Sequence, residues 1–178
     1  MFSHLLVSVI SDDKPGVVEA IAETISDEGG NWLESRLSQL SGKFAGVIRL
    51  SIAPEKVQTL ETKLLQLDQK GIWIKCEQIE TAQKNDSVNA SAKIHVLGPD
   101  RPGIVKELST ALVARHINLA ELETALSSMP YSGDPLFEAS GQLEIPPGTD
   151  LAGLHDTLDD IADALALDIS FSENEGSE

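Results

Sequence analysis

The segments Asp13-Lys14-Pro15-Gly16-Val17-Val18 and Asp100-Arg101-Pro102-Gly103-Ile104-Val105 are two copies of one motif, 87 positions apart. The same shift carries Asn31 onto Asn118. It also superimposes the apolar positions that follow at helical spacing, which are Val18, Ile21 and Ile25 in the first copy and Val105, Leu108 and Leu112 in the second. Agreement at so many positions indicates an internal repeat, and a repeat of this length predicts two copies of one domain.

Each copy predicts the element order βαββαβ. In the first copy the strand-like segments are residues 5–10, 32–40, 44–52 and 72–79, and the two helical stripes follow Pro15 and Pro54. Gly29 and Gly30 end the first helix and Gly71 ends the second, because glycine readily takes the left-handed conformation found after helices. Ser41 and Gly42 predict a tight turn between the two middle strands.

The second copy repeats this order with one difference. Phe44 corresponds to Phe137 at a shift of 93 positions rather than 87, so six residues are inserted between the middle strands. The insertion falls around residues 128–134, where turn-forming residues favour a longer hairpin loop. The final helix and strand of this copy are predicted at residues 151–165 and 167–171.

These elements predict an α+β chain with two tandem ferredoxin-like βαββαβ domains, each a four-stranded antiparallel sheet with two helices on one face. We expect the first domain at residues 1–80, a polar linker at 81–91, the second domain at 92–172 and a disordered acidic tail at 173–178. One face of each sheet has no helix, so its apolar surface and strand edges can pair with another sheet. This predicts sheet pairing, either within a chain or in a homo-oligomer.

The chain is strongly acidic, with 29 Asp and Glu against 13 Lys and Arg and a net charge of −16. Binding to nucleic acid requires clustered cations that replace the counterions of the phosphates, so we expect no direct DNA or RNA binding. No apolar run approaches the roughly 20 residues of a membrane span, and the first residues lack the features of a secretion signal. Cys76 is the single cysteine, which excludes an intramolecular disulfide. We therefore expect a cytoplasmic protein with no membrane contact.

No residue pattern predicts catalysis, a metal site or a cofactor. His4, His95, His116 and His155 are scattered and show no zinc-binding spacing. No Ser, Cys or His stands beside an evident base, and the phosphate-binding loop of acylphosphatases, which share this fold, is absent. An RNA-recognition domain has the same element order, but the first predicted strand lacks a stacking aromatic and the net charge is unfavourable. We therefore predict that the protein is not an enzyme.

The repeated motif has the chemistry of an anion site, because the start of a helix presents free N–H groups and a partial positive charge. Glycine, which has no Cβ, also lets a ligand approach the backbone. We expect six backbone amides to hold a carboxylate, those of Gly16, Val17 and Val18 and of Gly103, Ile104 and Val105. Four polar side chains are expected beside the loops to hold an ammonium group, namely Asp13, Asn31, Asp100 and Asn118. A purely structural interpretation remains, in which Asp caps the helix, Gly permits a turn and Asn tolerates a corner.

With this duplicated motif the chain resembles ACT domains, which sense amino acids in many regulatory proteins, over nearly its whole length. The bare tandem pair and the insertion within residues 128–137 are similar in particular to the glycine cleavage system transcriptional repressor family. The resemblance implies that the ligand is a small amino acid such as glycine, and that repression works through a DNA-bound activator protein rather than through DNA. One alternative stays open, a detached regulatory subunit in which the ACT pair controls a metabolic enzyme.

Overall fold

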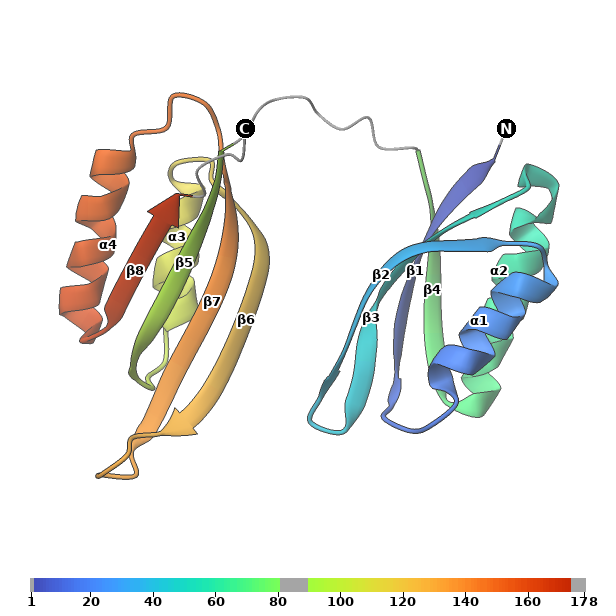
Figure 1. The fold of residues 1–178 in the computed structure, drawn as a ribbon, viewed down its shortest axis with the longest axis horizontal. Helices are drawn as coiled ribbons and strands as arrows, with labels where there is room; N and C mark the ends of the chain where they lie inside the picture. The colour runs from blue at the N-terminus through green and yellow to red at the C-terminus, as the bar shows by residue number, and fades with distance from the viewer. Residues whose placement is uncertain (1, 81–89, 174–178) are drawn as a thin grey trace. The chain divides into compact units, whose positions relative to one another are not determined.

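The computed structural model describes residues 2–80 and 90–173, which belong to two compact units of the chain (Figure 1). We call residues 2–80 domain 1 and residues 90–173 domain 2. Each domain has the element order βαββαβ. The prediction of two tandem α+β domains of one fold is therefore confirmed.

The strands and helices of domain 1 are β1 (Ser3–Asp12), α1 (Val17–Asp27), β2 (Asn31–Leu40), β3 (Lys43–Ile52), α2 (Val57–Leu65) and β4 (Ile72–Ile79). Short 3-10 turns at Pro54–Lys56 and Gln66–Lys70 flank α2. Those of domain 2 are β5 (Ala90–Pro99), α3 (Ile104–Val113), β6 (Asn118–Ser128), β7 (Pro135–Ile145), α4 (Leu151–Leu165) and β8 (Asp168–Glu173).

Both sheets have the same topology, with strand orders β2-β3-β1-β4 and β6-β7-β5-β8. Every neighbouring pair is antiparallel. Figure 1 shows the two helices of each domain on one face of its sheet. The turn between β2 and β3 uses Ser41 and Gly42, which both have positive φ angles of 51° and 77° and so give the tight hairpin that the sequence predicts.

Each domain has its own apolar core between sheet and helices. In domain 1 the odd-numbered residues Leu5, Val7 and Val9 of β1 are at most 4% exposed, because alternate side chains of a strand point to one face. The predicted stripe of α1 began at Val18, but the structure buries Val17 and leaves Val18 44% exposed. Val17 shares a helix face with Ile21 four residues later, whereas Val18 is turned about 100° away.

The two domains join their helices through different polar contacts. In domain 1 the buried carboxylate of Glu28, at the end of α1, pairs with Lys63 of α2 and lies 4.0 Å from Lys56. The hydrogen bond from Lys63, and then the positive charges of Lys63 and Lys56, lower the pKa of Glu28. In domain 2 Arg115, just beyond α3, donates to the carbonyl of Gly153 and to Thr157 in α4.

Part of the predicted linker and tail lies outside the described residues. Of the linker at 81–91 only Ala90 and Ser91 are described, and they begin β5. Of the tail at 173–178 only Glu173 is described, as the last residue of β8. The domain limits set from the sequence otherwise stay a prediction.

Adjacent leucines of α2 test the packing of domain 1. Leu64 is fully buried and Leu65 is 50% exposed. We expect Leu64→Ala to lower the free energy of unfolding by about 2–5 kcal/mol through loss of core packing, and Leu65→Ala by less than about 1 kcal/mol. Trp32 and Trp73, the two tryptophans of the chain, both lie in domain 1, so their fluorescence during urea unfolding reports this domain alone. Equal losses in the two variants would contradict the packing described.

Candidate functional site

The two copies of the motif form the same helix-start loop, between β1 and α1 and between β5 and α3. Gly16 and Gly103 precede the helices with φ angles of 92° and 103°. The first helical hydrogen bonds run from the Ala20 amide to the Gly16 carbonyl, at 3.0 Å, and from Glu107 to Gly103, at 2.9 Å. The backbone amides of residues 17–19 and 104–106 therefore precede the first helical hydrogen bond and are the free donors of a helix start.

No side chain caps either helix, so the structural interpretation in which Asp13 or Asp100 acts as the cap does not hold. Each Asp instead anchors its loop through the backbone. The Asp13 amide donates to the Gly42 carbonyl in the β2–β3 turn, and the Asp100 amide donates to Pro135 at the start of β7, both at 2.9 Å. The loops are thus fixed at the hairpin end of each sheet, and the two carboxylates are exposed.

A shallow hollow of about 430 Å³ lies against the loop of domain 1. Residues 13–18 and Phe44 of β3 line it. The structure thereby brings together four of the predicted site residues, Asp13, Gly16, Val17 and Val18. Lys14, which also lines the hollow, donates from its side chain to the Lys70 carbonyl at 2.8 Å. This hydrogen bond ties the loop to the end of the 3-10 turn that follows α2.

The glycines are required by backbone geometry rather than by crowding. A Cβ built on Gly103 would meet no atom within 4 Å, and one on Gly16 would meet only the Glu19 carboxylate, at 4.0 Å. Both φ angles, however, lie in the left-handed region that side chains disfavour.

In domain 2, as in domain 1, the first helical residue is buried and the second exposed, with Ile104 at 2% and Val105 at 43%.

The expectation that Asn31 and Asn118 lie beside the loops of their own domains is wrong. Asn31 pairs with Ser51, which pairs with His4, whereas the loop follows Asp12 at the other end of β1. His4 and Asp12 are eight residues apart along β1, a distance of about 26 Å at roughly 3.3 Å per residue. The helix α1 returns the chain to the start of the sheet, so β2 begins far from the loop.

Asn118 occupies the same place in domain 2. It pairs with Glu144 and donates from its side-chain amide to that carboxylate, at 2.9 Å. Glu144 pairs with Ser91 near the start of β5, whereas the loop follows Pro99. A small amino acid cannot reach the loop and the Asn of one domain together.

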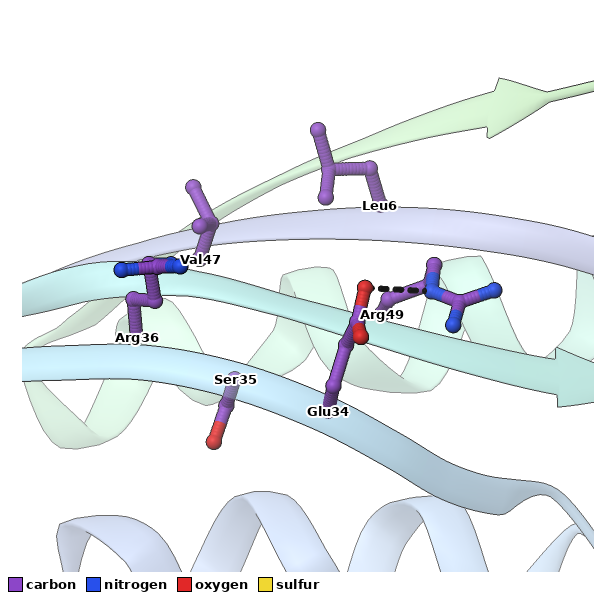
Figure 2. A pocket seen from close by; sticks show the side chains of 6 residues that line it. All are labelled: Leu6, Glu34, Ser35, Arg36, Val47 and Arg49. Atoms are coloured by element: carbon purple, nitrogen blue, oxygen red, sulfur yellow. Dashed lines mark hydrogen bonds and ion pairs between the residues drawn. The ribbon is translucent and has the colours of Figure 1, made fainter. Parts of the chain in front are cut away.

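A second hollow, which the sequence analysis missed, lies on the sheet of domain 1. It measures about 370 Å³ and is lined by Leu6, Glu34, Ser35, Arg36, Val47 and Arg49. Figure 2 shows five of these side chains on one side of the sheet and Ser35 on the other. Arg49 donates from Nε to Glu34 at 2.7 Å, and this hydrogen bond and the charge of Arg49 lower the pKa of Glu34.

Three features of the described residues concern metal binding, thiol chemistry and membrane contact. Within residues 2–80 and 90–173, no three His, Cys, Asp or Glu side chains come together as a metal site. Burial raises the pKa of the Cys76 thiol to about 11, so it is protonated and a poor nucleophile near neutral pH. In the same ranges no helix is long and apolar enough to cross a membrane.

Comparison with known proteins gives one family and several relatives. Residues 3–77, nearly all of domain 1, match the ACT domain family. The glycine cleavage system transcriptional repressors of Escherichia coli (strain K12) and Shigella flexneri are each 28% identical over 120 residues. The aligned region covers 67% of this chain and 63% of each relative.

Two solved structures have the same fold over the whole chain. A protein of unknown function from Galdieria sulphuraria has a TM-score of 0.85 at 22% identity, with 98% of this chain and 99% of that chain covered. A protein provisionally described as a glycine cleavage system transcriptional repressor has a TM-score of 0.70 at 19% identity, with 99% of each chain covered. At these identities the likeness establishes the fold of the tandem pair.

The left-handed glycine gives a direct test of the loop. We expect Gly16→Ala to destabilise domain 1 by about 1–2 kcal/mol, since alanine disfavours this conformation. Urea unfolding followed by tryptophan fluorescence measures the loss, with the exposed Val18→Ala as the control. A helical φ at this position would give the opposite result, because alanine stabilises a helix by roughly 0.5–1 kcal/mol relative to glycine.

Proposed function

Residues 3–77 of this chain match the ACT domain family, and on that premise we propose that the chain is an amino-acid-responsive repressor of the glycine cleavage system. It acts in the cytoplasm, through contact with a DNA-bound activator protein rather than with DNA. The observation that carries this proposal is the helix-start loop, present twice with the same backbone geometry. The name of the 28% identical relatives supplies the regulated system.

The loop suits the carboxylate of a small amino acid. The amides of Gly16, Val17 and Val18 lie at the positive end of α1, where an anion is stabilised by N–H donors and by the helix dipole. The amides of Gly103, Ile104 and Val105 have the same position at α3. Proline supplies no donor in either loop, so the glycine amide is the first that is free.

The ammonium group needs an acceptor close to the same loop. The exposed carboxylates of Asp13 and Asp100 are the only predicted acceptors that remain near the loops among the described residues, since Asn31 and Asn118 lie at the opposite sheet ends. An open hollow of about 430 Å³ at Asp13 accommodates a small ligand such as glycine. The proposed site is therefore an amide cluster with one carboxylate in each domain.

The charge of the chain supports an indirect action on transcription. Residues 1–80 carry 12 acidic and 8 basic side chains, a net charge of −4, and residues 90–178 carry 16 and 4, a net charge of −12. Neither half offers the excess of cations needed to displace counterions from DNA. Control of genes by this chain then requires a partner protein that binds the DNA.

Binding of a small amino acid is testable by titration calorimetry. We expect glycine or serine to bind, and Asp13→Asn combined with Asp100→Asn to weaken binding about 5- to 150-fold, the equivalent of losing about 1–3 kcal/mol of hydrogen bonding to a charged group. Asn31→Ala is the matched control and should bind as the native protein does. No heat with any amino acid at millimolar concentration would contradict the proposed site.

The indirect mechanism predicts a specific pattern in electrophoretic mobility assays. The purified chain alone should leave the glycine cleavage promoter unshifted at physiological salt, and should supershift or release the DNA when the activator is present. Glycine should reverse this effect. A specific shift by the chain alone would contradict the mechanism, whereas control of an enzyme with no effect on the activator would favour the alternative of a detached regulatory subunit.

A further inference from the structure

The side of the domain 1 sheet that faces away from α1 and α2, here called the open face, exposes large apolar side chains. Because residues 5, 7 and 9 of β1 point to the helices, the even-numbered residues of β1 point to the open face. Ile10 lies beside Trp73 of β4, and Val47 of β3 pairs with Ser8. Ile10 is 47% exposed, Val47 38% and Trp73 51%. An exposed group of this kind that includes tryptophan marks an interaction surface.

Cations surround this apolar group. Arg49 pairs with Leu6, and Arg36 pairs with Val47, so the two guanidinium groups flank an apolar floor (Figure 2). Glu34 accepts the Nε donor of Arg49, and Figure 2 shows the terminal nitrogens of Arg49 turned away from it. Those nitrogens are in position to donate to a carboxylate of another molecule.

Two lysines extend the cationic rim toward β4. Lys43 lies 5.9 Å from the centre of the Trp73 ring, and Lys75 pairs with Ser8. Both lysines also have a carboxylate partner, Asp12 and Glu77 respectively. The open face therefore presents four cations around apolar side chains, and three of these cations pair with the carboxylates Glu34, Asp12 and Glu77 of the same face, on a protein whose net charge is −16.

Domain 2 shows that the fold itself does not require this composition. Its strands have the same order and the same register as those of domain 1, so each paired position of one open face has a counterpart in the other. Three cross-strand pairs of domain 1 have counterparts of different chemistry in domain 2. Leu6–Arg49 corresponds to Lys93–Gln142, Val47–Arg36 to Ser140–Glu123, and Ile10–Trp73 to Leu97–Asp168. The same positions have thus lost the tryptophan, both arginines and two apolar residues. Domain 2 keeps one apolar residue, Leu97, and has one cation, Lys93, at these positions, so the tryptophan and the two arginines distinguish the open face of domain 1.

We propose that the open face of domain 1 is the surface on which the activator docks, and that the activator presents apolar side chains there, rimmed by carboxylates. This inference rests on the proposed function. Tryptophan and arginine dominate the binding energy of protein interfaces, and the open face offers both around an apolar centre. Its cations complement an acidic partner surface, whereas the open face of domain 2 would repel it.

A direct binding measurement tests the surface. The full chain is titrated into the labelled activator of the glycine cleavage genes, with fluorescence anisotropy as the readout. We expect Val47→Glu and Trp73→Ala to weaken binding at least tenfold. The matched controls are the same kinds of change at the corresponding positions of domain 2, Ser140→Glu and Asp168→Ala, which should alter the affinity less than twofold. Urea unfolding of all four variants confirms that each remains folded.

The outcomes separate the inference from the proposed function. The native chain could bind the activator and both open-face variants could bind it equally well, or the domain 2 controls could lose binding to the same extent. Either result would overturn the docking surface and leave the regulatory role intact. Absence of binding by the native chain, with or without amino acid and promoter DNA, would overturn both. Sedimentation that shows the native chain self-associating, with Val47→Glu monomeric and still able to bind the activator, would assign the open face to a second copy of the chain and refute the proposal.

Discussion

The alternation of side chains along β1 is the constraint on which the functional features of domain 1 depend. β1 is hydrogen-bonded to β3 on one side and to β4 on the other, so its orientation is fixed. Leu5, Val7 and Val9 bind the helices to the sheet, and this burial obliges Leu6 and Ile10 to lie on the open face. The same strand ends at the helix-start loop. A slip by one residue would exchange the two faces and remove both the core and the proposed docking surface.

The fold could be predicted from the sequence because its signals are local. Prolines, glycines and apolar stripes mark where the helices of each copy begin and end, and the second copy supports each helix and strand predicted in the first. The stripe in α1 was predicted to begin at Val18, which is wrong, since Val17 and Val18 are both apolar and the motif alone does not distinguish which one faces the core. Burial of Val17 four residues before Ile21 resolves this in the structure.

The sites were harder to predict because they depend on register between distant segments. The equal offset of Asn31 and Asn118 from their motifs is real, but an offset along the chain does not say that a helix has carried the Asn to the other end of the sheet. The hollow at Leu6 joins three strands, and β2 contributes through an irregularity between Trp32 and Glu34. That bulge shifts the alternation, so Glu34 lies on the same face as Asn31, three residues earlier. The alternation of side chains along β2 alone does not predict this bulge or the position of Glu34.

The helix-start loop and the open face of domain 1 share one structural element, the β2–β3 hairpin. The Asp13 amide donates to Gly42, and the next residue, Lys43, pairs with Asp12 and lies over Trp73. The hydrogen bond from Lys43, and then its charge, lower the pKa of Asp12, so this carboxylate is ionised at neutral pH. Under the proposed function, a ligand bound beside Asp13 lies next to residues that contact the proposed docking surface. Such a ligand changes the affinity for the partner only by the difference in its own affinity for the free and the partner-bound chain, because coupling between two sites is reciprocal. Under the proposed function, the contacts from Asp13 through Gly42 and Lys43 to Trp73 link the helix-start loop of domain 1 to the proposed docking surface.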